Sequence, residues 1–223
     1  MKTVKVPKEL VVNLFDRGAI VVGQMITRHD KTETKFDLQL DDLVPTNREI
    51  RQQLARLLLR QLRWYYDGNL RTSRFGLVDV SPPINKVVTT ISNGVKGECP
   101  TASIATRMHN GAPHIKIYGR VAVGFNYTLV DDILWSGHTI ADMFGFWFWR
   151  HRYPIDYILI FCDAQVGGLA SLQKAVNKLT GDVGIKDIPI DCLTTRKEIL
   201  DILLEANKIT REAYDLAMEG AAV

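Results

Sequence analysis

Apolar residues recur along the chain at two spacings, one typical of amphipathic helices and the other of strands. The helical spacing is clearest over residues 50–65, and Thr46-Asn-Arg-Glu49 predicts a capping box just before them. A shorter helix is expected at 7–16. Residues 19–40 alternate as two strands that meet at a polar tip, 28–35. The chain is therefore expected to open with a small element of one helix and one hairpin.

Further along, apolar runs of the kind that a parallel sheet buries on both faces alternate with helical patterns. The expected strands are 86–92, 114–118, 127–130 and 157–161. The expected helices between and after them are 100–108, 139–150 and 169–179, followed by helices capped by Thr195 and Thr210. This alternation predicts the α/β fold class, a doubly wound, mostly parallel sheet flanked by helices, with its site at the carboxyl ends of the strands.

The composition is that of an ordinary globular protein and excludes few classes of function. Of the 223 residues 46% are apolar, and a net charge of +3 does not by itself indicate nucleic acid. The three cysteines, Cys99, Cys162 and Cys192, are scattered, which favours a reduced compartment. No apolar stretch is long enough to span a bilayer. We expect a cytoplasmic protein with no membrane partner.

Residues 127–139 combine an apolar strand, two adjacent acids, a turn of mostly small residues and a helix start. Consecutive strand side chains point to opposite sides, so at least one of Asp131 and Asp132 should face the crevice and accept hydrogen bonds from a sugar diol. The turn precedes a helix N-terminus, where free N–H groups and the helix dipole suit a phosphate. The alternative is that the two acids only end a strand and cap a helix.

This order of residues resembles the diphosphoribosyl-binding signature of the type I phosphoribosyltransferases. The resemblance covers most of the chain and is closest to orotate phosphoribosyltransferase, with similar segments at 8–24, 92–97, 161–168 and 194–203. It implies a single domain over residues 1–223. The parts of that domain would be an N-terminal hood at 1–45, an α/β core at 46–193 and C-terminal helices at 194–223.

The resemblance also implies roles for individual residues. Asp131 and Asp132 would be catalytic, because they would bind the ribose hydroxyls and favour a developing oxocarbenium ion. The residues expected at the 5-phosphate are Trp135, Ser136, Gly137, His138 and Thr139. The residues expected at pyrophosphate are Arg28, Lys96, Gly97 and Arg120, and those expected at the base are Phe36 and Ala164. Mg²⁺ would be held mainly through pyrophosphate and ribose oxygens, with no metal site of the protein's own.

The sequence departs from the family pattern at three positions, mostly where the family binds the pyrophosphate and the base. The long basic loop that the family carries before the signature is replaced by residues 119–126, in which Arg120 is the sole cation. Ala164 stands where the family places an arginine that pairs with the orotate carboxylate, and alanine can make no such pair. Trp135 is bulky at a position that is usually small. The base is therefore the part of the substrate that the sequence determines least.

The implied activity is that of a pentosyltransferase of pyrimidine and nucleotide metabolism. It would bind phosphoribosyl pyrophosphate or a nucleoside monophosphate and transfer phosphoribose to a pyrimidine-type base such as orotate. The alternative is a catalytically inactive relative that senses nucleotides or serves in assembly, which the short loop and Ala164 favour. A third possibility, an RNA-binding regulator, is kept open, although nucleic acid is not the expected partner.

One expected helix is crowded with large aromatic residues: Phe144, Phe146, Trp147, Phe148 and Trp149. A single core face cannot hold all five side chains, so some of them are expected at a subunit interface. Core packing with chance exposure is the alternative. The resemblance to dimeric enzymes favours a homodimer.

Overall fold

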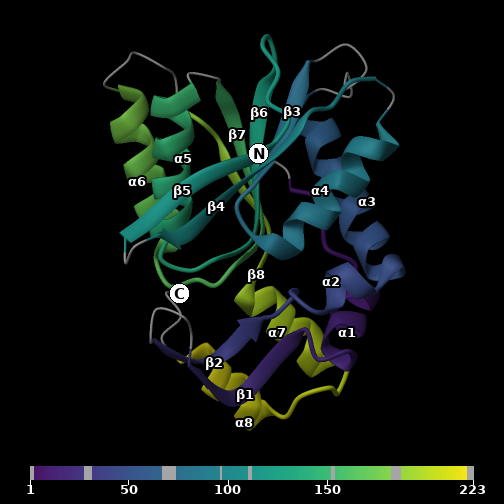
Figure 1. The fold of residues 1–223 in the computed structure, drawn as a ribbon. Coiled ribbons are helices and arrows are strands. Elements are labelled where there is room, and N and C mark those ends of the chain that lie inside the picture. The colour runs from purple at the N-terminus through teal and green to yellow at the C-terminus, as the bar shows by residue number, and fades with distance from the viewer. Residues whose placement is uncertain are drawn as a thin grey trace.

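The structure is a computed structural model that describes residues 3–27, 32–66, 74–95, 97–109, 112–151, 154–181 and 187–219. Within these residues the larger sheet has six strands in the order β5-β4-β3-β6-β7-β8 (Figure 1). Its strands are β3 (Phe75–Asp79), β4 (Thr101–His109), β5 (Ala112–Gly119), β6 (Asn126–Leu134), β7 (Ile155–Asp163) and β8 (Ile190–Thr195). All neighbouring pairs in it are parallel except β4 and β5, which are antiparallel.

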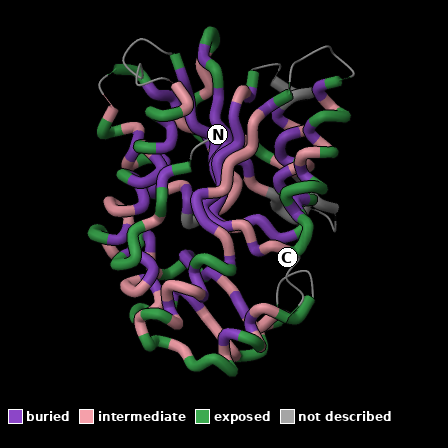
Figure 2. Tube along the Cα trace, turned by 180° about the vertical axis from the view of Figure 1, so that it is seen from behind, coloured by how far each residue is buried: buried purple, intermediate pink, exposed green. Residues whose placement is uncertain are grey.

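The helices cover both faces of this sheet. Their bounds are α1 (Lys8–Asp16), α2 (Leu43–Thr46), α3 (Arg48–Tyr65), α4 (Pro82–Gly94), α5 (His138–His151), α6 (Gly168–Gly181), α7 (Arg196–Glu205) and α8 (Arg211–Met218). Helices α3 and α4 lie on one face and α5 and α6 on the other, so the sheet between them is buried (Figures 1 and 2). The predicted fold class, a mostly parallel α/β sheet flanked by helices, is confirmed.

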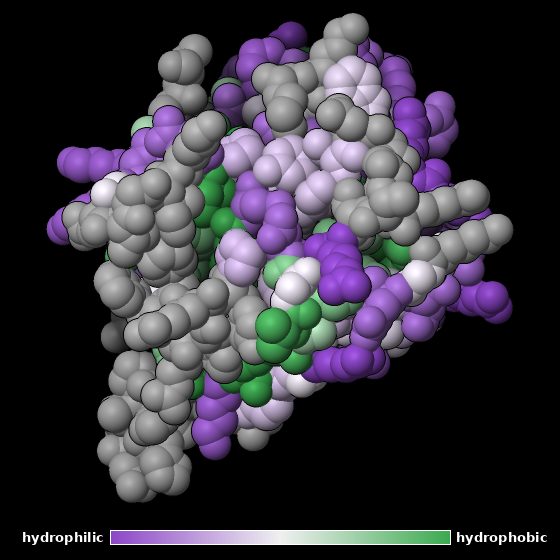
Figure 3. Space-filling view, turned by 90° about the horizontal axis from the view of Figure 1, so that it is seen from above, coloured by the Kyte–Doolittle hydropathy of each residue, from purple (hydrophilic) through white to green (hydrophobic). Residues whose placement is uncertain are grey.

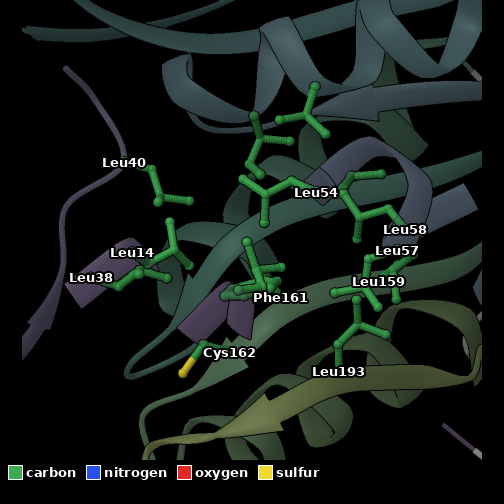
Figure 4. Packing of buried hydrophobic residues seen from close by; sticks show 14 of the residues in the cluster. Leu14, Leu38, Leu40, Leu54, Leu57, Leu58, Leu159, Phe161, Cys162 and Leu193 are labelled. Atoms are coloured by element: carbon green, nitrogen blue, oxygen red, sulfur yellow. The ribbon is translucent and has the colours of Figure 1, made fainter. Parts of the chain in front are cut away.

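The N-terminal residues form a hood, made of α1 and the antiparallel hairpin of β1 (Ile20–Thr27) and β2 (Glu33–Leu38). Helix α8 packs on this hairpin, where a Cβ at Gly23 would lie 3.2 Å from Cβ of Ala213. The hood and the core share one hydrophobic cluster, in which Leu14 and Leu38 lie near Phe161 of β7 (Figure 4). The position of the hood over the sheet is therefore fixed by apolar packing.

Two segments of the core differ from the sequence prediction. Residues 86–92, expected as a strand, belong to α4, and residues 100–108, expected as a helix, form most of β4. The β-branched run in α4 favours a strand by propensity, but its buried residues have the i, i+3, i+4, i+7 spacing of a helix face: Ile84, Val87, Val88 and Ile91. Strands β3 and β8 were not predicted. β3 is five residues long, and its Gly76 is required because a Cβ there would lie 2.3 Å from the Tyr127 ring.

The helix starts follow local capping chemistry. At α7 the predicted capping box of Thr195 and Glu198 is confirmed, and Thr210 caps α8 as predicted. The capping box predicted at Thr46 is wrong by one residue, since the side chain of Asn47 caps α3. The Thr46 hydroxyl instead donates to the carbonyl of Asp42 at 2.6 Å, within the short helix α2.

Within the described part of α5, the aromatic side chains belong mainly to the protein's own core. Phe144 and Trp147 are fully buried in this chain, and Phe146 is half-buried. The side chains of Phe148 and Trp149 lie outside the described residues. The expected homodimer therefore stays a prediction, and Phe144 and Trp147 do not support it. None of the described helices combines the length and apolar character that a bilayer span requires.

A buried polar network ties the N-terminus to the far strands of the sheet. The amide nitrogen of Gln61 donates to the Tyr157 hydroxyl at 3.1 Å and to the Asp191 carboxylate at 3.0 Å. Its oxygen accepts from the backbone of Val4 at 2.9 Å. Gln61 is fully buried and joins Val4 to a pair that is itself bonded, since the Tyr157 hydroxyl also donates to Asp191 at 2.7 Å.

We expect Gln61→Leu to lower the free energy of unfolding by about 2 kcal/mol, because it leaves the Val4 amide without this acceptor and removes one of the two donors to Asp191. Gln53→Leu, on the same helix, is the control: its amide donates to Glu49 at the surface, and its loss should stay below about 0.5 kcal/mol. Urea unfolding of both variants measures the difference. Equal losses would show that the network adds nothing to stability.

Candidate functional site

The strand order brings the carboxyl ends of three parallel strands together. β6 lies between β3 and β7, with Val130 opposite Asp79 and Leu134 opposite Asp163. The helix that follows β3, α4, lies on one face of the sheet, and the helix that follows β6, α5, lies on the other. A crevice at such a point, outside the carboxyl ends of the strands, is where ligands bind in open α/β sheets.

Asp131 and Asp132 are the last acidic residues of β6, and both are buried, at 7% and 9% exposure. Each carboxylate accepts a hydrogen bond from the following backbone amide at 2.9 Å. Burial raises the pKa of both, and for Asp131 the charge of Asp132 raises the pKa further. Such a pair resists carrying two negative charges, so the site favours a ligand that brings hydroxyl donors to it.

A cleft of about 730 Å³ lies between the hood and the end of β6, and Asp132 is part of its wall. Asp131, on the other side of the strand, lies beside Ser81. The lining is strongly acidic, because Asp37, Asp41 and Asp42 join Asp132 there. Arg17 is the only cationic side chain among the described lining residues. The cleft therefore attracts hydroxyl groups and cations more readily than a polyanion.

The turn after β6 leads directly into α5. Gly137 has a φ of +78°, in the left-handed region, and Ser136, His138 and Thr139 around it are exposed. Trp135 is nearly buried and forms part of the cleft wall. The first amides of a helix have no partner within the helix, so the start of α5 presents N–H groups beside the cleft.

This turn is held against the turn between β7 and α6. A Cβ at Gly168 would lie 1.7 Å from the carbonyl oxygen of Trp135, and a Cβ at Gly137 would lie 2.7 Å from the carbonyl oxygen of Gly168. The amide of Ala164 also donates to the carbonyl of Leu134 at 2.9 Å. Backbone therefore packs directly on backbone, which fixes the position of the expected phosphate loop.

The structure separates the residues expected at pyrophosphate from those expected at ribose. Gly97 follows α4 and precedes β4, so it lies at the amino end of the parallel strands. Arg120 lies at the same end: its backbone donates to Thr101, and its side chain pairs with Glu98. The structure therefore does not bring Gly97 and Arg120 together with Asp131, because 92–97 end a helix instead of a strand, and their role at pyrophosphate stays a prediction. Arg28 and Lys96 lie outside the described residues.

Figure 3 looks onto this amino end of the strands, where hydrophilic side chains surround a smaller group of hydrophobic ones. This end also carries residues 119–126, which lead into the amino end of β6. Arg120 therefore cannot approach Asp132 without unfolding the strand between them. Residues 119–126 do not replace the family's mobile loop at this site.

The segment that does follow a strand at the site is 79–82, between β3 and α4, which the sequence analysis missed. Asp79 is buried there and accepts from the Ser103 hydroxyl at 2.9 Å and from the Asn85 amide at 3.2 Å. Burial raises the pKa of Asp79 to about 6. The Ser81 hydroxyl is buried and forms no well-aligned hydrogen bond with any described group. The Ser-Pro-Pro sequence, a helix-start signal, could have revealed this loop.

The two residues expected at the base are both fully buried. Phe36 lies on β2 in the hood, and Ala164 directly follows β7. The Phe36 ring lies over the guanidinium group of Arg196, whose Cζ is 6.0 Å from the centre of the ring. Neither Phe36 nor Ala164 is part of the described cleft wall. In the described residues, no three His, Cys, Asp or Glu side chains converge as a metal site.

Neither a family model nor a curated protein sequence matches the chain. Among solved structures, it is similar to UMP synthase of Leishmania donovani, with a TM-score of 0.66 and 18% identity over 94% of this chain. The chain spans 41% of that protein's length. It is also similar to orotate phosphoribosyltransferase from Aeropyrum pernix, with a TM-score of 0.59 and 18% identity over 88% of this chain and 98% of the other.

A third similar structure is adenine phosphoribosyltransferase from Trypanosoma brucei, in complex with AMP, pyrophosphate and ribose-5-phosphate. Its TM-score is 0.59 at 10% identity, over 89% of this chain and 88% of the other. The chain thus has the fold of the type I phosphoribosyltransferases. The predicted resemblance is confirmed at the level of the fold.

Gly137→Ala tests the packing of the two turns. We expect it to lower the free energy of unfolding by about 3 kcal/mol or more, because the new Cβ meets a backbone oxygen and also raises the strain of a positive φ. Gly124→Ala is the control, with φ of +80° and Arg74 Nη1 as its nearest neighbour at 3.5 Å, and should cost about 1–2 kcal/mol. Chemical denaturation compares them. Similar losses would mean that the turns are not tightly packed.

The raised pKa of Asp79 predicts a pH dependence of stability. Between pH 4 and 6 the unfolded chain releases the Asp79 proton while the folded protein keeps it, so stability should fall by up to about 3 kcal/mol as pH rises. In Asp79→Asn this contribution is absent, and the other acids act alike in both proteins. Urea unfolding at several pH values gives the difference between the two profiles. Parallel profiles would contradict the raised pKa.

Proposed function

We propose that the protein binds the 5-phosphoribosyl group of phosphoribosyl pyrophosphate or of a nucleoside monophosphate. The observation that carries the proposal is the geometry at the end of β6. There Asp132 opens onto the cleft, and a glycine-containing turn with exposed Ser136 and Thr139 begins α5. This arrangement offers acceptors for the ribose hydroxyls and N–H and hydroxyl donors for the 5-phosphate, a few residues apart.

In the enzymatic form of the proposal, phosphoribose is transferred to a pyrimidine-type base such as orotate. The ribose ring gains positive charge as its bond to the leaving group lengthens, and the acids of the cleft would stabilise that charge. Positioning and charge supply most of the rate in such a displacement, so no nucleophilic side chain is needed. The similarity to orotate and adenine phosphoribosyltransferases supports this form.

We include Mg²⁺ in the proposal for the enzyme. It would neutralise pyrophosphate when bound, and the ligand's own oxygens would supply most of its coordination. The described residues fit this arrangement to the extent that the cleft carries carboxylates, Asp41 and Asp42 among them, which suit a hydrated magnesium ion. Asp132 would orient the ribose beside it.

A second candidate, a nucleotide-binding protein without turnover, is favoured by the distribution of charge. A departing pyrophosphate needs cations close to it. Arg120, like Gly97, lies at the amino end of the strands, away from the cleft. Arg17 is the only cation of the described cleft lining. Such a site suits a nucleoside monophosphate, which carries less charge than phosphoribosyl pyrophosphate.

Calorimetric titration with uridine 5′-monophosphate, and with phosphoribosyl pyrophosphate plus Mg²⁺, tests the binding. Asp132→Asn should weaken binding by about 10-fold or more, since it removes a charged acceptor of ribose hydroxyls. Asp142→Asn, an exposed acid on α5, is the matched control and should change affinity less than about 2-fold. Equal effects of the two substitutions would remove Asp132 from the site.

Turnover separates the two candidates. Release of pyrophosphate with orotate, uracil or another base in the assay would establish the enzyme. Binding without release on every base would establish the nucleotide-binding protein. Binding of neither ligand would contradict both.

A further inference from the structure

The positive charge of the chain is concentrated in one layer, formed by α3 and α4. Helix α3 carries five arginines and one glutamate, and α4 carries one lysine and no acid, which together give a charge of +5. The whole chain carries only +3, so the rest of it has a net charge of −2. The two helices pack side by side on one face of the sheet (Figure 1). The small total charge therefore conceals a basic surface.

Three of the arginines lie on the outer face of α3. Arg56, Arg60 and Arg63 have the i, i+4, i+7 spacing that places side chains along one side of a helix, and all three are exposed. We call them the arginine stripe. In the described part of the chain, none of the ion pairs includes any of the three. The stripe thus offers three cations that no acid of the described chain neutralises.

Surface that suits flat rings lies beside the stripe. Trp64 is one helical turn from Arg60, and its side chain is 54% exposed. A hollow of about 270 Å³ opens further along the helix, where Arg56 and Arg60 form part of its wall. The remaining wall is apolar at Pro7, Leu10 and Leu57 and polar at Glu9 and Gln53. Cations therefore alternate with an exposed aromatic ring and an apolar hollow.

This combination matches a single strand of nucleic acid better than other anions. A single strand carries a phosphate at every nucleotide, and each unpaired base has a face that can stack on an aromatic side chain. An acidic peptide would use the cations but not an exposed tryptophan among them. An anionic membrane would require an apolar helix face to insert, and the apolar face of α3 is buried in the protein's own core.

We propose that the arginine stripe and Trp64 bind a single-stranded nucleic acid, with the arginines at its phosphates and its bases on Trp64 and in the hollow. The surface shares no residue with the cleft wall beneath the hood. It is a second binding surface, and it does not depend on the proposed function of the cleft.

Fluorescence anisotropy with a fluorescein-labelled twelve-nucleotide oligouridine RNA measures the binding. We expect a Kd on the order of 10 μM at moderate salt, as is typical of binding without sequence preference. A duplex RNA of the same length should bind more weakly, because its bases are already stacked on one another. Excess uridine 5′-monophosphate should not displace the oligonucleotide, since the cleft is elsewhere.

Replacing all three arginines of the stripe with glutamine removes the charge and keeps residues that favour a helix. The triple variant should bind the oligonucleotide about 10-fold more weakly or worse. If each arginine contacts one phosphate, the slope of log affinity against log salt should fall by about 2. The urea midpoint should stay close to that of the unaltered protein, because the three side chains are exposed.

A second triple variant, Lys174→Gln with Lys178→Gln and Arg211→Gln, is the matched control. It removes the same total charge from exposed helical positions on α6 and α8. It should change the affinity less than about 2-fold. An equal loss in both triple variants would mean that net charge alone attracts the oligonucleotide, and would overturn the proposal.

Trp64 provides an independent test at constant charge. Trp64→Ala should weaken binding by about 5-fold or more, and Trp64→Phe should keep most of the affinity, because a phenyl ring still stacks on a base. Equal affinities of these two variants would contradict the stacking role. The proposal also fails if the protein does not bind the oligonucleotide, binds the duplex as tightly, binds polyglutamate instead, or releases the RNA to uridine 5′-monophosphate.

Discussion

The parallel alignment of β6 with β3 and β7 decides which residues of this protein can meet. It places the carboxyl ends of the three strands side by side, so that Asp79, Asp132 and Asp163 lie in one region although they are far apart in sequence. Arg120 lies at the opposite, amino end of the strands. Because neighbouring strands are joined by ladders of backbone hydrogen bonds, no side-chain motion can undo this separation.

Two consequences for ligand binding follow from this alignment. The turn after Asp132 is fixed by the backbone contact between Gly137 and Gly168, so its donors are positioned before a ligand arrives. The cleft beneath the hood is acidic, since Asp37, Asp41 and Asp42 line it together with Asp132. A ligand with a phosphate at one end and hydroxyl groups beside it matches this arrangement.

The sequence predicts the parts of the fold whose signals are local. The capping box at Thr195 and the strand that leads into Asp131 are set by nearby residues, and both are found. Residues 86–92 were misassigned because their β-branched side chains favour a strand, while packing against the sheet makes them helical. The burial of Arg196 was not predicted for a similar reason. An arginine after a capping threonine suggests an exposed helix start, but Arg196 is 1% exposed and Phe36 of the hood lies over its guanidinium group.

The central claim is that the end of β6 and the start of α5 hold a ribose 5-phosphate. A crystal structure with ribose 5-phosphate tests it most directly. The account predicts phosphate oxygens within hydrogen-bond distance of backbone amides in 136–139 and ribose hydroxyls at Asp131 or Asp132. A phosphate bound instead at the opposite edge, beside Gly97 and Arg120, would contradict it.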